Sequence, residues 1–334
     1  MSSSLSTAQL LFYISQLFTI YVSFIILFAG IFGHITIIFI LTRFKIFRGN
    51  PSAFFLITES SIDLLELTII LTSRIAINGF LNDLTQTSLV WCKLRAFFIQ
   101  SLTLISLSIV CCAAIDQYLS TSYYAFLRQK STIRTAKILT TITSAIWILH
   151  GSLAFIFFDI QSTLGCNIYT HDFVNYVTYV YYLILTGILP ITISSFFSIL
   201  AYQNVRRIIR RGMPIRRRKL DQQLTAMILA RVSFLDAMTL PYVLQRIYTL
   251  AVPTNGSSSI SQAIIQVIGT VFITFFHLNY AGSFYLFFIS STRFRRQFKY
   301  AFTNKIWQVY CRKRTNRNQV APGTQIGGSD FDLE

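Results

Sequence analysis

The stretch from Cys92 to Tyr118, CKLRAFFIQSLTLISLSIVCCAAIDQY, decides how the chain folds. Between Phe97 and Tyr118 its only charged residue is Asp116, close to the end of the run. An α-helix needs about 20 mainly apolar residues to cross the roughly 30 Å hydrocarbon core of a bilayer. The stretch therefore predicts a membrane-spanning helix.

Six other runs of similar length and apolarity flank this one along the chain. With it they make seven predicted spans: Thr19 to Leu41, Phe54 to Ser73, Phe97 to Tyr118, Ile138 to Phe158, Val177 to Tyr202, Met227 to Leu250 and Ala263 to Ser290. The composition agrees, because 53% of the residues are hydrophobic and only 12% are charged, about half the charge of a soluble domain. We predict an all-α membrane protein, a seven-helix bundle.

The C-terminal part divides into two predicted pieces. Phenylalanines alternate with basic residues after the last span, which is typical of a short amphipathic helix lying at the membrane surface. This eighth helix completes a single domain over residues 1–310. Residues 311–334 read as a short disordered tail.

The 29 basic residues are unevenly distributed. Most of them lie in the first, third and fifth predicted loops and in the tail, which all fall on one side of the membrane. Basic residues in short loops stay on the cytoplasmic side, so we expect the N-terminus outside and the C-terminus inside. The net charge of +17 then faces anionic lipid, and a nucleic-acid partner is not indicated because the basic residues adjoin membrane helices.

The five cysteines fall at different depths. Cys92 and Cys166 both lie on the predicted outer, oxidising side and can pair. Cys111 and Cys112 lie within a span, as small buried thiols do. Cys311 follows the basic amphipathic segment and is a candidate for palmitoylation, the alternative being an ordinary free thiol.

The order of several short motifs resembles that of the rhodopsin-like (class A) G-protein-coupled receptors. The third span opens with Cys92 and closes with Asp116-Gln117-Tyr118, where that family has a disulfide cysteine and Asp-Arg-Tyr. The resemblance covers most of the chain and also rests on Gly33-His34, Asp63, Trp147, Pro190, Pro241 and Ser283-Phe284-Tyr285-Leu286-Phe287. It implies a receptor in the plasma membrane that binds an extracellular ligand and activates a heterotrimeric G protein.

Several positions depart from the family pattern. Gln117 stands where the family has arginine, Thr239 where it has a tryptophan, and Phe284 and Phe287 where it has proline and tyrosine. The resemblance places the activation switch at Asp116, Gln117, Tyr118, Asp221, Pro241, Ser283 and Phe287. A neutral Gln117 can hydrogen-bond Asp221 but cannot form a charged latch. The seventh-span motif is closest to that of invertebrate peptide-type receptors.

The resemblance also places a ligand site between the outer halves of the helices. Its candidate residues are Ile99, Gln100, Tyr242, Gln245 and Arg246, with Lys93 and Arg95 at the rim. Amine receptors of the family carry an aspartate where this chain has Ile99, so a peptide-like ligand is favoured over an amine. The positive balance suits a carboxylate or an acidic peptide. Asn255 begins a glycosylation sequon in the loop between the sixth and seventh spans.

A cation site is implied deeper in the bundle. Asp63, Ser106, Asn279 and Ser283 fall where this family binds sodium, and oxygen ligands with a carboxylate suit a hard cation. The alternative is an Asp63 that is protonated or hydrogen-bonded to His34. Arg231 and Asp236 lie on the same span but are poorly spaced for a direct pair, so we expect each to reach a different neighbour.

No enzymatic chemistry is predicted and no cofactor other than the possible sodium ion. The four histidines lack the spacing of metal ligands, and neither a phosphate-binding glycine loop nor a nucleophile elbow is present. Two alternatives to a coupling receptor stay open. One is a receptor-like protein that no longer couples, given Gln117, and the other is a transporter or channel that uses the intramembrane charges.

Overall fold

The computed structural model describes residues 2–44, 47, 49–161, 165–210, 215–251, 259–292 and 294–301. The predicted glycosylation site at Asn255, the palmitoylation site at Cys311 and the tail over 311–334 lie outside the described residues. The backbone of Asp221 is described, but its side chain lies outside what the structure describes. Residues 294–301 belong to a separate compact unit and form a helix, in agreement with the predicted eighth helix.

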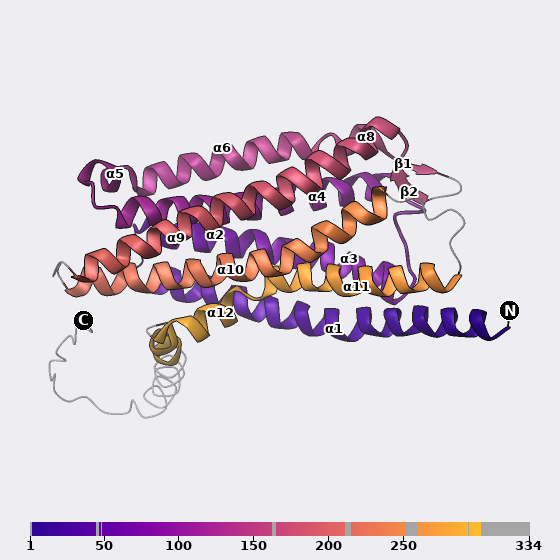
Figure 1. Ribbon diagram of the computed structural model, residues 1–334, viewed down its shortest axis with the longest axis horizontal. Helices are drawn as coiled ribbons and strands as arrows, with labels where there is room; N and C mark the ends of the chain where they lie inside the picture. Colours follow the sequence, from indigo (N-terminus) through magenta and orange to yellow (C-terminus); the bar gives the residue numbers. More distant parts are fainter. Residues whose placement is uncertain are drawn as a thin grey trace, which may run out of the picture. The chain divides into compact units, whose positions relative to one another are not determined.

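Long helices make up the main unit, as Figure 1 shows. The first three spans are α1 (Ser2–Arg43), a second run made of α2 (Pro51–Glu66), η2 (Leu67–Leu71), α3 (Thr72–Arg74) and η3 (Ile75–Gly79), and α4 (Leu89–Thr121). The fourth comprises α6 (Ile133–Gly151) and α7 (Ala154–Phe157), preceded by the short α5 (Ala125–Lys130). The fifth comprises α8 (His171–Asn175), η4 (Tyr176–Ile188) and α9 (Leu189–Arg210), and the last two are α10 (Ile215–Ala251) and α11 (Ser259–Ala281) with α12 (Ser283–Ser290).

Local signals in the sequence set several helix starts. The side chain of Asn50 accepts a hydrogen bond from the backbone N–H of Ala53, and Pro51 occupies the first turn, where its missing N–H costs nothing. Ser88 caps α4 in the same way through the N–H of Trp91. The second and fifth spans contain π-helical turns, η2, η3 and η4, which widen the helix locally.

The helix boundaries differ from the predicted spans. α1 begins at Ser2 rather than Thr19, and the second run continues to Gly79 rather than ending at Ser73. Hydropathy marks only the part that matches the hydrocarbon core, whereas the backbone hydrogen bonds continue the helix through polar residues. The predicted seventh span is interrupted at Gly282, where a Cβ atom would come within 2.6 Å of the ring of Phe234.

A small sheet was not predicted. β1 (Phe158–Gln161) and β2 (Gly165–Ile168) pair antiparallel, with Ile160 opposite Cys166. Gly165 has φ +66°, and a Cβ there would meet the side chain of Gln86 at 3.2 Å, so a glycine suits both the backbone and the close approach. The sheet lies at the opposite end of the bundle from α5, and we call these the sheet end and the α5 end (Figure 1).

The bundle presents apolar side chains outward and buries polar and charged residues within an otherwise apolar core. α4 is central, since it packs against α2, α6, α9 and α10 and most of its length is buried. α1 packs against α11 and presents Tyr21, Ile25, Phe28, Phe32 and Ile35 outward. Apolar side chains on the outer face suit contact with lipid, and charged residues within the spans face the bundle interior.

Six helices in the described part of the chain are long and apolar enough to cross a membrane. The second run, Pro51–Gly79, is long enough but carries Glu59, Asp63, Glu66 and Arg74, all of which are buried in the bundle. Because those charges face other helices rather than lipid, this run forms the seventh element of an all-α, multi-pass membrane bundle.

Candidate functional site

A cavity of ≈ 760 Å³ opens among the helices at the sheet end. Pockets for small ligands in proteins commonly have volumes of about 300–1,000 Å³. Four of the five predicted ligand residues line it: Ile99, Tyr242, Gln245 and Arg246. Gln100 is buried elsewhere in the bundle and is not one of the lining residues, because α4 turns its side chain away from the cavity that Ile99 faces.

Three arginines from three helices line the same cavity. They are Arg74 of α3, Arg95 of α4 and Arg246 of α10. Within the described residues no carboxylate oxygen lies within 4.0 Å of any of their nitrogens, since the ion pairs found involve Arg231 alone. A charged side chain inside a membrane costs at least about 2.5 kcal/mol on insertion scales, so three such cations need a compensating interaction.

The three guanidinium groups are held to different degrees. Arg95 Nε donates to Ser73 Oγ at 2.8 Å. Arg246 donates from Nη2 to the Tyr182 hydroxyl at 3.1 Å and lies 5.2 Å from the centre of that ring. The Nε atoms of Arg74 and Arg246 are buried and have no hydrogen-bond partner among the described residues. Donors are thus available toward the cavity.

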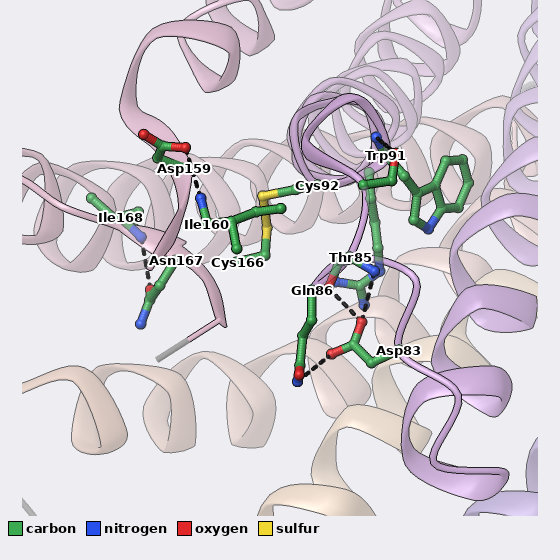
Figure 2. The surroundings of a disulfide bond; sticks show 12 residues. Asp83, Thr85, Gln86, Trp91, Cys92, Asp159, Ile160, Cys166, Asn167 and Ile168 are labelled. Atoms are coloured by element: carbon green, nitrogen blue, oxygen red, sulfur yellow. Dashed lines mark hydrogen bonds between the residues drawn. A yellow bond between two sulfur atoms is a disulfide. The ribbon is translucent and has the colours of Figure 1, made fainter. Parts of the chain in front are cut away.

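A disulfide ties the sheet to the bundle beside this cavity. Cys92 at the start of α4 is bonded to Cys166 of β2, with their Cα atoms 5.7 Å apart, as predicted. Figure 2 shows Asp83 close to this bridge, where its carboxylate accepts hydrogen bonds from Thr85 and Gln86. The bridge therefore fixes one wall of the cavity, to which Cys166 itself contributes.

Further from the sheet end than the cavity, a buried arginine joins three helices. Arg231 of α10 is 1% exposed, and its Nε donates to Glu59 Oε1 of α2 at 2.5 Å. Its Nη1 donates to Asn279 Oδ1 of α11 at 2.5 Å, and its Nη2 lies 3.8 Å from Asp63 Oδ2. Asp236, five residues further along α10, instead accepts a hydrogen bond from Ser195, so the two residues reach different neighbours as expected.

Two of the four residues of the predicted sodium site, Asp63 and Asn279, face this arginine. Ser106 Oγ donates to Asp63 Oδ1 at 2.5 Å, and the Ser283 hydroxyl is buried without a hydrogen-bond partner in the described part of the chain. The suggested bond between His34 and Asp63 does not form, because His34 Nε2 lies 2.7 Å from the backbone oxygen of Tyr280. His34 of α1 therefore uses Nε2 to contact α11 and not Asp63 of α2.

At the α5 end, α4 is linked to α2 and α10 through polar side chains. Asp116 accepts hydrogen bonds from Ser52 and Ser131, each at 2.6 Å. Gln117 Nε2 donates to Thr225 Oγ1 of α10 at 2.5 Å, and Gln117 Oε1 accepts from Ser52 at 3.1 Å. At Gln117, where the family has an arginine, α4 and α10 are therefore joined by a hydrogen bond between neutral side chains.

The other predicted switch residues lie along the same helices. The ring of Tyr118 packs against Phe197 at 5.5 Å, and Pro241 lies inside α10, between the cavity and Arg231. Phe287 of α12 is buried.

A family model described as 7 transmembrane receptor (rhodopsin family) matches residues 33–281. The chain belongs to this family.

A comparison with curated proteins gave no match. Members of the rhodopsin family are receptors rather than enzymes, and the family match accounts for the seven-helix bundle and the disulfide. The similarity of the seventh-span motif to that of invertebrate peptide-type receptors stays a prediction.

Three residues that line the cavity of this rhodopsin-family receptor, Glu66, Arg74 and His277, were not among the predicted ligand residues. A usable signal existed for two of them. Glu59, Asp63, Glu66 and Arg74 follow a spacing of about three and a half residues per turn, so they share one helix face. A face this polar within a membrane span points to the bundle interior.

Proposed function

We propose that this chain is a G-protein-coupled receptor of the plasma membrane that binds an extracellular, peptide-like ligand in the cavity at the sheet end. The observation that carries the proposal is the pairing of that cavity with a polar helix contact at the far end of the same two helices, α4 and α10. A ligand that moves α10 at one end changes the Gln117 contact at the other.

The distribution of charge supports an orientation with the sheet end outside. Basic residues such as Arg128, Arg134, Lys137 and Arg206 lie around the α5 end, where the positive-inside rule places the cytoplasm. The disulfide at the sheet end suits an oxidising exterior. The N-terminus is then extracellular and the C-terminus cytoplasmic.

The lining of the cavity favours a peptide-like ligand over an amine. Ile99 lines it at the position where an amine receptor needs a carboxylate. The volume of ≈ 760 Å³ exceeds what a small amine would fill, and polar residues such as Gln245, Gln262 and Gln266 offer amide groups that pair with peptide backbone.

Activation is proposed to be a shift between two states of α10. A ligand that binds better when the α5 end is open raises the population of that state by its difference in affinity for the two. A heterotrimeric G protein that binds the open end must then raise the ligand affinity by the same factor.

A receptor that does not couple is the second candidate, and the neutral Gln117 favours it specifically. The test is ligand-independent and ligand-stimulated G-protein dissociation in cells, comparing the native chain with Gln117→Arg at equal surface expression. Signal above empty cells in either form, increased by members of a peptide library, would support coupling. Silence from both forms in the presence of surface receptor would support the non-coupling alternative, and uptake or ion flux would indicate a transporter.

A further inference from the structure

We propose that the ligand presents a carboxylate group to Arg74, Arg95 and Arg246 at the sheet end of the cavity. This inference rests on the proposed function and specifies the chemistry of its ligand. The three guanidinium groups come from α3, α4 and α10, and all line one cavity. Arg74 was not among the predicted ligand residues. Because it lines the same cavity as Arg246 and Arg95, the three guanidinium groups together form a candidate anion site.

The cavity's own acids leave these cations without close partners. Its lining includes two carboxylates, Glu66 and Asp83. Asp83 accepts hydrogen bonds from Thr85 and Gln86, as Figure 2 shows, and neither acid lies within 4.0 Å of the three arginines. An anion from outside is therefore the group that satisfies them.

The donors are held ready for a planar anion. Arg246 is fixed by Tyr182 and Arg95 by Ser73, while the Nε atoms of Arg74 and Arg246 remain buried and unpartnered among the described residues. A guanidinium group binds a carboxylate through two parallel hydrogen bonds, and a site held rigid before binding loses little entropy. Aromatic rings of Tyr182, Tyr242 and Phe276 supply the apolar surface next to it.

The test uses the purified, detergent-solubilised full chain and two probes of nearly equal shape, phenylacetate and phenylacetamide. At about 10 mM, a concentration that fills a millimolar site, we expect phenylacetate to raise the melting temperature by about 2–4 °C and phenylacetamide to leave it unchanged. Arg74→Met and Arg246→Met should each abolish the shift. Lys137→Met is the matched control, because Lys137 is an exposed basic residue of α6 toward the α5 end and does not line the cavity, and it should keep the shift.

Equal shifts with both probes, no shift with phenylacetate, or a shift retained in Arg74→Met would each overturn the proposal. If one variant does not fold, judged by size-exclusion chromatography, Arg74→Lys preserves the charge but lacks the planar fork and should reduce the shift. The assay contains no G protein. A melting-temperature shift with phenylacetate, together with no G-protein signal in cells, would mean that the anion site exists and the signalling proposal fails. A G-protein signal without the shift would mean that the receptor signals and the anion site is wrong.

From a separate observation we infer that Arg231 takes the place of the sodium ion. Of the four predicted ligands, Asn279 already accepts a hydrogen bond from this guanidinium group and Asp63 faces it at 3.8 Å. Glu59, at 2.5 Å, holds the arginine in place. A second cation there would meet a like charge in a medium of low dielectric constant, so the residues do not fit a resident sodium ion.

The test compares the melting temperature of the purified chain in sodium chloride and in choline chloride at equal ionic strength. We expect no difference for the native chain and a higher value in sodium for Arg231→Gln, which removes the positive charge facing Asp63 and frees Asn279 Oδ1. Stabilisation of the native chain by sodium over choline would overturn this inference, whether or not the variant folds.

Discussion

At the scale of single residues, the amide of Gln117 is the clearest departure with a structural consequence. It spans two helices, donating to Thr225 of α10 and accepting from Ser52 of α2. A neutral hydrogen bond contributes about 0.5–1.5 kcal/mol, less than the 1.5–3 kcal/mol typical of bonds to charged groups. The link that Gln117 makes between α4 and α10 is therefore weaker than the link an arginine would make to a charged partner.

Removing the acceptor on α10 tests this contact. Thr225→Val keeps the shape of the side chain and deletes its hydroxyl, which should raise ligand-independent signalling about five-fold, the equivalent of roughly 1 kcal/mol. The measurement is basal G-protein dissociation normalised to surface receptor.

Ser120→Ala is the matched control for that change. The Ser120 hydroxyl donates within its own helix, to the backbone oxygen of Gln117, and does not bridge two helices. Basal signal should therefore stay at the native level. Equal signals from native chain and Thr225→Val, in a form that still responds to ligand, would contradict the role given to this bond.

At the scale of elements, close approach of helices depends on small residues. A Cβ at Gly33 of α1 would come within 2.8 Å of the Cβ of Phe284 in α12, an atom fixed by its own backbone. A Cβ at Gly151 of α6 would meet the hydroxyl of Ser101 in α4 at 1.9 Å. Membrane helices associate through such packing because lipid supplies no hydrophobic driving force between them.

Gly33→Ala should accordingly lower stability by about 1–3 kcal/mol, the usual cost of overpacking, since α1 must move away from α12. The measurement is the melting temperature of the purified chain. Ile35→Val is the control on the same helix, because Ile35 is 54% exposed on the outer face and its change should have little effect. A melting temperature for Gly33→Ala equal to that of the control would show that the helix contact is looser than the structure has it.

At the scale of the whole molecule, charge and the disulfide support the proposed orientation, with the two ends of the bundle in opposite compartments. In this proposal the basic residues around α5 and at the end of α9 lie on the inner face, and the Cys92–Cys166 bond lies on the outer one. Between the two ends, α1 and α6 present apolar side chains outward, as contact with the hydrocarbon layer requires.

An epitope tag before Met1 should therefore bind antibody on intact cells, whereas a tag after Glu334 should bind only after permeabilisation. Flow cytometry of cells carrying either tagged form measures this. Staining of the C-terminal tag on intact cells would reverse the orientation and, with it, the assignment of the cavity to the extracellular side.

The fold was largely predictable because the bilayer imposes a length and a composition on each span. Runs such as 97–118 are apolar over the length of a membrane crossing, and the motif order placed Cys92, Asp116 and Pro241 on the third and sixth helices correctly. Helix ends, the π-helical turns, the break at Gly282 and the small sheet were not predictable, since they depend on backbone hydrogen bonds and neighbours that hydropathy does not register.

The sequence by itself determined the membrane bundle, the family and the residues available for a site. Only the tertiary structure decided which of them meet: Arg74 and Arg246, distant in sequence, face one cavity, and Arg231 reaches Glu59 and Asn279 on two other helices. The physical reason is that hydropathy and spacing describe one helix at a time. The partner of a buried charge is set by the rotation and depth at which separate helices pack, and in a medium of low dielectric constant that choice fixes the chemistry of the site.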